Sequence, residues 1–259
     1  EFNNYLDGRR VAIIGLGVSN IPLIEYLHEI GSEVMVFDSR EIDKIDVEIM
    51  NKIICYDMEY SLGENYLEKL AGFDIIFRSP SCLPTNPALQ LEASRGAIIT
   101  TEIEMFMELC PGTIFGVTGS DGKTTTSTLI YEILKAKGYN CYLGGNIGIP
   151  LFTKVKDMTP KDMIVLELSS FQLMGMKISP KVSVVTNITP NHLNIHEGME
   201  EYIEAKKNIM KYQSVKDGVV ILNYDNNITK EFGKDAPGKV IYFSHDAKIS
   251  EGYMVDRNS

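Results

Sequence analysis

A glycine-rich segment in the middle of the chain, residues 116–126, constrains the fold more than any other part of the sequence. It reads Gly-Val-Thr-Gly-Ser-Asp-Gly-Lys-Thr-Thr-Thr, follows an apolar run at 113–117 and opens a helical pattern at 124–137. A strand, a glycine loop and a helix start bind phosphate, because backbone N–H groups and the positive helix N-terminus converge on its oxygens. Lys123 adds a full charge, and the hydroxyl of Thr124 suits Mg²⁺. The flanking elements disfavour the alternative, a surface turn that carries a lysine.

Composition limits the classes of protein that this chain can belong to. The 259 residues are 44% hydrophobic and 23% charged, which is typical of globular proteins and sufficient for two domains. The net charge of −10 argues against a general nucleic-acid binder or a protein that binds anionic membranes. Four cysteines lie far apart without a Cys-x-x-Cys pair, so we interpret them as reduced thiols of a cytoplasmic protein.

The first part of the chain carries an incomplete dinucleotide-binding fingerprint. A strand at 10–14 leads into Gly15-Leu16-Gly17-Val18-Ser19-Asn20, then a helix, then a strand at 33–38 that ends in Asp38. This is the β-α-β outline of a Rossmann fold, with asparagine in place of the third glycine. We therefore expect a nucleotide diphosphate here rather than a nicotinamide cofactor. Asp38 would meet a ribose or base, and Ser39 and Arg40 would meet phosphate or base, although a solvated surface charge is the alternative for Arg40.

Strand and helix patterns alternate along the remaining chain. The alternation predicts an α/β fold with mostly parallel sheets, in which a Rossmann-like domain at 1–110 precedes a phosphate-loop domain at 111–259. The least clear stretch is 46–68, where we predict a short strand around 53–54 and a helix near 65–70. The helix after the phosphate loop should present one apolar face made of Leu129, Ile130, Ile133 and Leu134.

Two further strand ends of the second domain carry polar groups that could bind a metal ion. Glu167 ends a strand at 162–167, and His192 follows a strand at 181–187. Because the carboxyl ends of parallel strands share one edge of a sheet, both side chains should face the phosphate loop and could hold Mg²⁺, directly or through water. A structural carboxylate and a structural histidine remain the alternatives.

At this point the chain resembles the Mur ligases. The resemblance is carried by the phosphate loop, by Gly-Gly-Asn-Ile-Gly at 144–148, by Leu-Glu-Leu-Ser-Ser-Phe-Gln-Leu at 166–173, by Asn-Ile-Thr-Pro-Asn-His-Leu at 187–193 and by Tyr-Ile-Glu-Ala-Lys at 202–206. The phosphate loop alone is shared with folylpolyglutamate synthases. The 166–173 motif, together with segments 15–19, 37–40 and 101–106, indicates the family member that adds D-glutamate.

The resemblance implies a role for each matching residue. The ATP phosphates would lie on Gly119, Ser120, Asp121, Gly122, Lys123, Thr124, Thr125 and Thr126. Thr124 and Glu167 would hold a first Mg²⁺ and His192 a second, with Lys206 carbamylated into a further ligand; from the pattern alone Lys206 would be a solvated helix lysine. Lys123, His192 and Lys206 would be the catalytic residues. The UDP-muramoyl substrate would contact Asn146, Ser169 and Gln172, and in the first domain Gly15, Gly17, Val18, Ser19, Asp38, Ser39 and Arg40.

The implied reaction is ATP-driven amide formation in peptidoglycan precursor synthesis. D-glutamate would be joined to UDP-N-acetylmuramoyl-L-alanine through an acyl phosphate, by a cytoplasmic and monomeric enzyme with no nucleic-acid or membrane partner. Two departures from the family pattern stand out: Asn191 and Asn194 replace aspartates, and Ser81 and Asn20 replace glycines where substrate phosphates would approach. The resemblance also implies a third, carboxy-terminal domain, so we expect the sequence given to stop at Ser259 before the central domain is complete and to be a piece of a longer chain. We therefore do not expect turnover from this chain alone. The alternatives are a UDP-sugar or ATP-binding protein that has lost catalysis, and a nicotinamide-dependent oxidoreductase.

Overall fold

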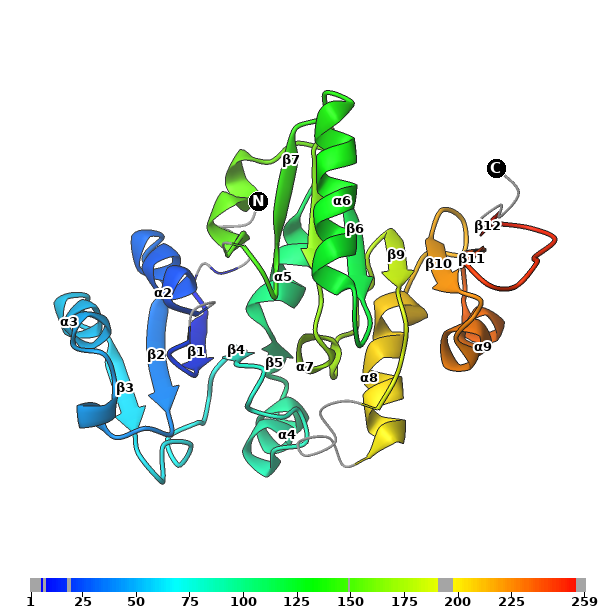
Figure 1. Ribbon diagram of the computed structural model, residues 1–259. Helices are drawn as coiled ribbons and strands as arrows, with labels where there is room; N and C mark the ends of the chain where they lie inside the picture. The colour runs from blue at the N-terminus through cyan, green and yellow to red at the C-terminus, as the bar shows by residue number, and fades with distance from the viewer. Residues whose placement is uncertain (1–5, 7, 18–19, 149, 191–197, 255–259) are drawn as a thin grey trace. The chain divides into compact units, whose positions relative to one another are not determined.

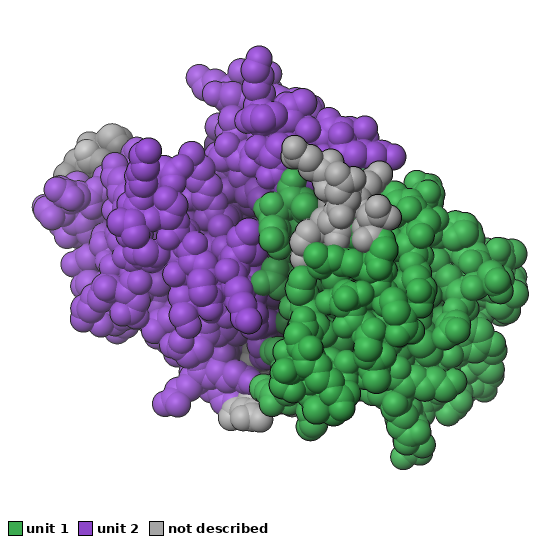
Figure 2. All heavy atoms as spheres, turned by 180° about the vertical axis from the view of Figure 1, so that it is seen from behind, with its two compact units in different colours: residues 1–109, 152–154 green, residues 110–151, 155–259 purple. Residues whose placement is uncertain are grey.

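The computed structural model describes residues 6, 8–17, 20–148, 150–190 and 198–254. The chain divides into two compact units, which are coloured separately in Figure 2. Unit 1 comprises Glu1–Leu109 and Phe152–Lys154, and unit 2 comprises Cys110–Leu151 and Val155–Ser259. Within the described residues no helix is both long and apolar enough to cross a membrane.

Unit 1 is built on a parallel five-stranded sheet in the order β3-β2-β1-β4-β5 (Figure 1). The order reverses beside β1, and in such sheets ligands bind outside the carboxyl ends of the strands at the point of reversal. The strands are β1 (Arg10–Ile14), β2 (Glu33–Asp38), β3 (Glu59–Leu62), β4 (Ile75–Arg78) and β5 (Ile98–Thr100). The helices are α2 (Asn20–Glu29), α3 (Val47–Cys55), α4 (Pro87–Ser94) and α5 (Glu102–Leu109), with a 3-10 turn η1 (Ile42–Lys44).

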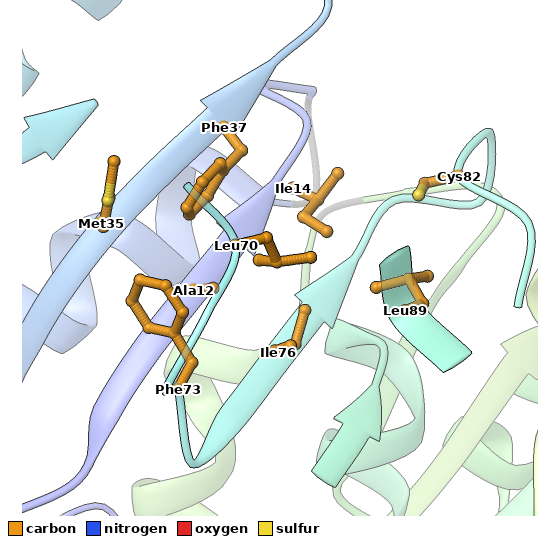
Figure 3. Packing of buried hydrophobic residues seen from close by; sticks show 9 residues of the cluster. All are labelled: Ala12, Ile14, Met35, Phe37, Leu70, Phe73, Ile76, Cys82 and Leu89. Atoms are coloured by element: carbon orange, nitrogen blue, oxygen red, sulfur yellow. The ribbon is translucent and has the colours of Figure 1, made fainter. Parts of the chain in front are cut away.

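Figure 3 shows the apolar side chains that pack between the strands of this sheet and the segments that cover it. The strand members of this group come from β1, β2 and β4, and within a strand they lie two residues apart, so they share one face of the sheet. Phe37 and Phe73 meet edge to face, with ring centroids 5.7 Å apart. The cluster consists of Ala12, Ile14, Met35, Phe37, Leu70, Phe73, Ile76, Cys82 and Leu89.

The prediction for residues 46–68 is wrong. Residues 53–54 lie in helix α3 and not in a strand, because the side chain of Asp46 accepts a hydrogen bond from Glu48 N at the helix start, and Met50 and Ile53 face inward at helical spacing. The strand of this region is β3, which pairs with β2. Residues 65–69 form turns, and no helix is present at 65–70.

Unit 2 is built on a parallel seven-stranded sheet in the order β12-β11-β10-β9-β6-β8-β7. Strand β6 lies between β8 and β9, and the phosphate loop leaves its carboxyl end. The strands are β6 (Thr113–Thr118), β7 (Cys141–Gly145), β8 (Met163–Glu167), β9 (Val182–Val185), β10 (Val219–Asn223), β11 (Lys239–Ser244) and β12 (Tyr253–Met254). The helices are α6 (Lys123–Ala136), α7 (Ser170–Leu173), α8 (Met199–Lys211) and α9 (Asn227–Asp235), and the 3-10 segment η2 (Phe152–Asp157) begins with the residues that belong to unit 1.

The apolar face predicted for α6 is only half buried. Ile130 and Leu134 pack against the core of Val117, Val165 and Val184, whereas Leu129 and Ile133 remain 56% and 61% exposed. The four residues span an arc wider than the strip of helix that rests on the sheet, so the sheet covers one side of the arc.

This difference gives a test of the α6 packing. We expect Leu134→Ala to lower the free energy of unfolding of unit 2 by about 2 kcal/mol, because it removes apolar contacts and leaves a cavity. The matched change Ile133→Ala should alter the same free energy by less than about 0.5 kcal/mol, because its side chain is exposed. Urea unfolding followed by circular dichroism measures both, and equal losses would contradict the packing described here.

Candidate active site

A cavity of about 390 Å³ lies at the carboxyl ends of the unit 1 strands. Gly15 allows the closest approach in its wall: its φ is +92°, and a Cβ there would lie 2.8 Å from both Cβ and Oγ of Ser79. The Ser79 hydroxyl is in turn 3.0 Å from that of Ser81. The cavity is therefore walled by glycine backbone and two serine hydroxyls. Its lining is Ile14, Gly15, Leu16, Gly17, Asp38, Ser39, Arg40, Tyr66, Ser79, Ser81 and Cys82.

Asp38 organises the glycine loop at this cavity. It is buried, and its carboxylate accepts hydrogen bonds from Leu16 N at 2.8 Å and from Arg40 N, Nε and Nη2 at 2.7–2.9 Å. Burial by itself would raise the pKa of Asp38, but the bonds from Arg40 and Leu16 outweigh it and lower the pKa below its ordinary value. Arg40 is thus held by Asp38 and by Leu16 O, although its side chain is 44% exposed. Contact of either residue with a nucleotide stays a prediction.

Asn20, which replaces a fingerprint glycine, donates hydrogen bonds to backbone carbonyl groups of the same loop. Its buried side-chain amide donates to Ile14 O at 3.1 Å and to Gly15 O at 2.8 Å. The asparagine therefore ties the end of β1 to the start of α2. Val18 and Ser19, two predicted substrate contacts, lie outside the described residues.

The phosphate loop closes on its own carbonyl groups. Lys123 Nζ donates to Gly119 O at 3.0 Å and to Ser120 O at 2.8 Å. Gly119 has φ +154°, and a Cβ there would lie 1.9 Å from Thr186 Oγ1, so only glycine fits. Ser120 bonds to Thr189 and is 3.0 Å from the hydroxyl of Tyr202. The side chain of Ser120, a predicted ATP-binding residue, therefore bonds to other protein groups in this structure.

Glu167 ends β8, the strand that lies between β6 and β7 in the unit 2 sheet. It is 2% exposed and accepts hydrogen bonds from Thr124 Oγ1 at 2.7 Å and from Asn146 Nδ2 at 3.0 Å. Asn146 N also donates to Glu167 O at 2.8 Å. Gly145, with φ +94°, makes this approach possible because a Cβ would lie 2.2 Å from Glu167 O. The start of α6 and the residue that follows β7 thereby converge on the carboxylate at the end of β8.

Lys206 is buried and not solvated, so the pattern-based reading of this residue is wrong. It is 2% exposed, and its Nζ donates to Thr118 Oγ1 at 3.3 Å and Gly119 O at 3.0 Å and lies 4.7 Å from the ring centroid of Tyr202. Burial, together with the nearby charge of Lys123, lowers the pKa of Lys206 to about 7. A lysine of this kind supplies a neutral, nucleophilic amine near neutral pH.

Ser169 and Gln172, predicted substrate contacts, bond to each other at the start of α7. Ser169 Oγ accepts from Gln172 N at 3.2 Å, and Gln172 Oε1 accepts from Ser169 N at 3.0 Å. The pair is a capping box, which satisfies N–H groups at the helix start. Their contact with a substrate stays a prediction.

The oxygen donors of this site fit Mg²⁺. Thr124 and Glu167 offer hard oxygen ligands side by side at the phosphate loop, and Mg²⁺ is usually held by one or two protein groups together with phosphates and water. Among the described residues no group of three or more His, Cys, Asp and Glu side chains could hold a metal ion. His192, the predicted second ligand, lies outside these residues, as do Asn191 and Asn194.

Comparison with known families accounts for both units. Residues 117–257 match the Mur ligase middle domain, and residues 9–101 match the MurD-like N-terminal domain of Mur ligases. The chain belongs to the Mur ligase family. It is 49% identical over 255 residues to the UDP-N-acetylmuramoylalanine--D-glutamate ligase of Acetivibrio thermocellus, covering 98% of this chain and 54% of that protein. The chain thus spans about half the length of the curated Mur ligases that it matches.

Solved Mur ligase structures share the fold. The UDP-N-acetylmuramate:L-alanyl-gamma-D-glutamyl-meso-diaminopimelate ligase from Neisseria meningitides has a TM-score of 0.57 at 16% identity, covering 94% of this chain and 82% of that one. The MurF ligase from Thermotoga maritima, solved in complex with ADP, has a TM-score of 0.50 at 19% identity, covering 84% of this chain and 48% of that one. The predicted α/β fold is confirmed.

Sequence reasoning gave no role to several residues that shape the Mur ligase site. Asn187 accepts from Ser120 N with its carbonyl and from Asp121 N with its side chain, both at 2.9 Å. Its place in the Asn-x-Thr-Pro motif at the end of β9 was the available signal. Thr118 and Tyr202, which contact Lys206, offered no comparable signal, because their proximity depends on where α8 packs.

The environment of Lys206 predicts a pH-dependent stability. Its pKa is about 7 in the folded protein against 10.5 for an unperturbed lysine, so between these values the unfolded chain binds the extra proton and stability rises with pH. Below about pH 7 the amine is protonated in both states, and the cost of burying its charge is present in full. We expect the stability of wild type relative to Lys206→Met to increase between about pH 6 and pH 9 in urea unfolding.

The control is Lys211→Met, which changes an exposed lysine at the end of the same helix. Its stability relative to wild type should be independent of pH over that range. The same pH-independence for Lys206→Met would contradict the environment described for Lys206.

Proposed function

We propose that this chain forms the substrate and ATP domains of a ligase that joins D-glutamate to UDP-N-acetylmuramoyl-L-alanine. The main support is the convergence of Lys123, Thr124 and the buried Glu167 at one sheet edge, in a chain 49% identical to curated ligases of that name. A separate cavity of about 390 Å³, lined by glycine backbone, serine hydroxyls and Arg40, suits a nucleotide diphosphate. The resemblance assigns ATP as the energy source and peptidoglycan precursor synthesis as the pathway, which we take to be cytoplasmic.

The proposed reaction proceeds in two transfers. An oxygen of the alanyl carboxylate attacks the γ-phosphorus of ATP, and the bond from this phosphorus to the β-phosphate oxygen breaks. ADP departs, and the alanyl carboxylate has become an acyl phosphate. The amine of D-glutamate then attacks the acyl carbon, phosphate leaves, and the amine loses a proton. Lys123, which now bonds to two loop carbonyl groups, would turn to the phosphate oxygens, where its charge and the loop N–H groups stabilise the transition state.

Thr124 and Glu167 would hold Mg²⁺, which neutralises phosphate charge when bound. Asn146 orients the Glu167 carboxylate by donating a hydrogen bond to its Oε1, while Oε2 accepts one from Thr124. The resemblance assigns a second ion to His192 and a carbamylated side chain to Lys206. The burial of Lys206 and its pKa of about 7 support this modification, because carbamate formation requires a neutral amine.

The overall function is tested by phosphate release from ATP. We expect the intact cellular protein to release phosphate with UDP-N-acetylmuramoyl-L-alanine and D-glutamate, and to release far less when L-glutamate replaces D-glutamate or no amino acid is added. Release that does not depend on D-glutamate would contradict the acceptor. Binding of both nucleotides without release would favour a protein that has lost catalysis, and Asn191→Asp with Asn194→Asp would be the first variants to make.

The role of Lys123 is tested by nucleotide binding. We expect Lys123→Ala to weaken the affinity for Mg²⁺·ADP by roughly 10- to 100-fold in calorimetric titration, because charge-assisted hydrogen bonds to phosphate are lost. Lys135→Ala, in the last turn of the same helix, should change this affinity by less than about twofold. Thermal unfolding of both variants controls for loss of fold, and unchanged affinity in a folded Lys123→Ala protein would remove the lysine from the phosphate site.

A further inference from the structure

Arg78, the last residue of β4, is a buried cation near the cavity of unit 1 that does not itself line it. It is 3% exposed, and arginine is almost never buried to this degree without partners. Its Nη1 donates to Cys82 O at 3.3 Å and, at the longer distance of 3.5 Å, to Ser79 O. Burial lowers the pKa of Arg78, and the nearby charge of Glu104 opposes the fall. Arg78 therefore remains a cation whose charge Glu104 counters and whose donors are used on the backbone that follows β4.

The backbone that Arg78 contacts is a tight turn, residues 79–82. Cys82 N donates to Ser79 O at 3.0 Å, which closes the turn, and Ser79 N donates to Ile14 O on the neighbouring strand at 2.9 Å. The side chain of Cys82 packs in the apolar cluster of the sheet, where Figure 3 shows it on the loop that follows β4. Arg78 thus bonds to the first and the last carbonyl group of the turn and sets the spacing between its two ends.

The turn forms one wall of the cavity. Ser79, Ser81 and Cys82 line it, and the hydroxyl oxygens of the two serines are 3.0 Å apart. The wall opposite is Gly15, where a Cβ would lie 2.8 Å from the Ser79 side chain, so there is little space for the turn to shift. A carbonyl oxygen facing the cavity would repel an anion, whereas the serine hydroxyls can donate to one. By taking up the two carbonyl groups, Arg78 leaves the hydroxyls as the donors of this wall.

Strand order indicates which part of a nucleotide this wall would meet. In Rossmann-like domains the diphosphate lies at the turn after the first strand, and the acid that ends the second strand meets the ribose. Strand β4 pairs with β1, and Arg78 lies opposite Ile14 in the register, so the turn flanks the glycine loop that begins at Gly15. Asp38 ends β2, which pairs with the other side of β1. The turn after β4 is therefore placed beside the diphosphate rather than beside the base.

We propose that Arg78 is a positioning residue for substrate binding: it holds the turn at 79–82 so that the hydroxyls of Ser79 and Ser81 donate to the diphosphate of the UDP-substrate. This inference rests on the proposed function, because it takes the unit 1 cavity to bind that substrate. Arg78 acts through the turn and does not touch the ligand. Its hold on the turn requires no ligand and is tested separately.

The hold on the turn is tested by amide hydrogen exchange in the ligand-free protein. We expect Arg78→Met to speed exchange of the Cys82 amide by about fivefold or more, because the turn opens more often. The Ser79 amide, which bonds to Ile14 O in the sheet, should change by less than about twofold. Unchanged exchange of the Cys82 amide, or equal acceleration of both amides, would overturn the hold.

The matched control is Arg10→Met. Arg10 opens β1, the strand next to β4, at the opposite end of the sheet, and its side chain is 44% exposed. Exchange of the Cys82 amide should be as in wild type. If Arg78→Met fails to fold because Glu104 is left without a counter-charge, Arg78→Met with Glu104→Gln replaces it in every measurement. Equal acceleration of the Cys82 amide by Arg10→Met would overturn the hold.

The effect on the ligand is tested by calorimetric titration with UDP. We expect Arg78→Met to weaken the affinity by about tenfold, because both hydroxyls lose their alignment with the phosphates, and Arg10→Met to change it by less than about twofold. Unchanged affinity in a folded Arg78→Met protein would overturn the proposal. Failure of wild type to bind UDP would overturn the proposed function together with the role of Arg78 in binding, while the exchange rates still decide its hold on the turn.

A double-mutant cycle with Ser81→Ala separates positioning from a general structural role. In the wild-type background Ser81→Ala should weaken the affinity for UDP by about fivefold, because a hydrogen bond to phosphate is lost. In the Arg78→Met background the same change should weaken it by less than about twofold, because the hydroxyl is already misplaced. Equal losses in the two backgrounds would mean that Arg78 does not act through this hydroxyl and would overturn the proposal.

Discussion

The hydrogen bonds of the buried Glu167 carboxylate hold together the carboxyl ends of neighbouring strands in the seven-stranded sheet. Its oxygens take one hydrogen bond from the helix that follows β6 and one from the segment that follows β7, and its own strand, β8, lies between them in the sheet. A charged group with so little exposure requires such partners, because burial removes its hydration. The same geometry that satisfies the carboxylate also places it beside the phosphate loop.

The phosphate loop concentrates positive charge in an acidic protein. Lys123 and Lys206 both donate to Gly119 O, at 3.0 Å each, although the chain has a net charge of −10. Burial, and after it the nearby charge of Lys123, lowers the pKa of Lys206. An anion that drew Lys123 away would satisfy its charge with phosphate oxygens in place of loop carbonyls, which is the electrostatic basis of the proposed ATP site.

Sequence patterns predicted the features that depend on neighbouring residues and missed those that depend on residues far apart in the chain. The glycine loop, the alternating strands and the Asp38 strand end were legible because each depends on neighbours within a few residues. The segment at 46–68 was misread because the β-branched Ile53 and Ile54 favour a strand locally, whereas the Asp46 cap and inward-facing Met50 decide for a helix. The buried state of Lys206 was invisible for another reason: its partners Thr118 and Gly119 lie more than 80 residues away in the chain.

By itself, the sequence determined the fold class, the phosphate loop and the family, because motifs of adjacent residues encode backbone conformation and the chemistry of a loop. Tertiary structure alone decided which groups meet. It brought Asn146 and Thr124 to Glu167, tied Arg40 to Asp38 at the glycine loop, and buried Phe152 in the unit that the chain had left more than 40 residues earlier. These outcomes depend on strand order and helix packing, and they are therefore set by the free energy of burying whole elements together rather than by any local pattern.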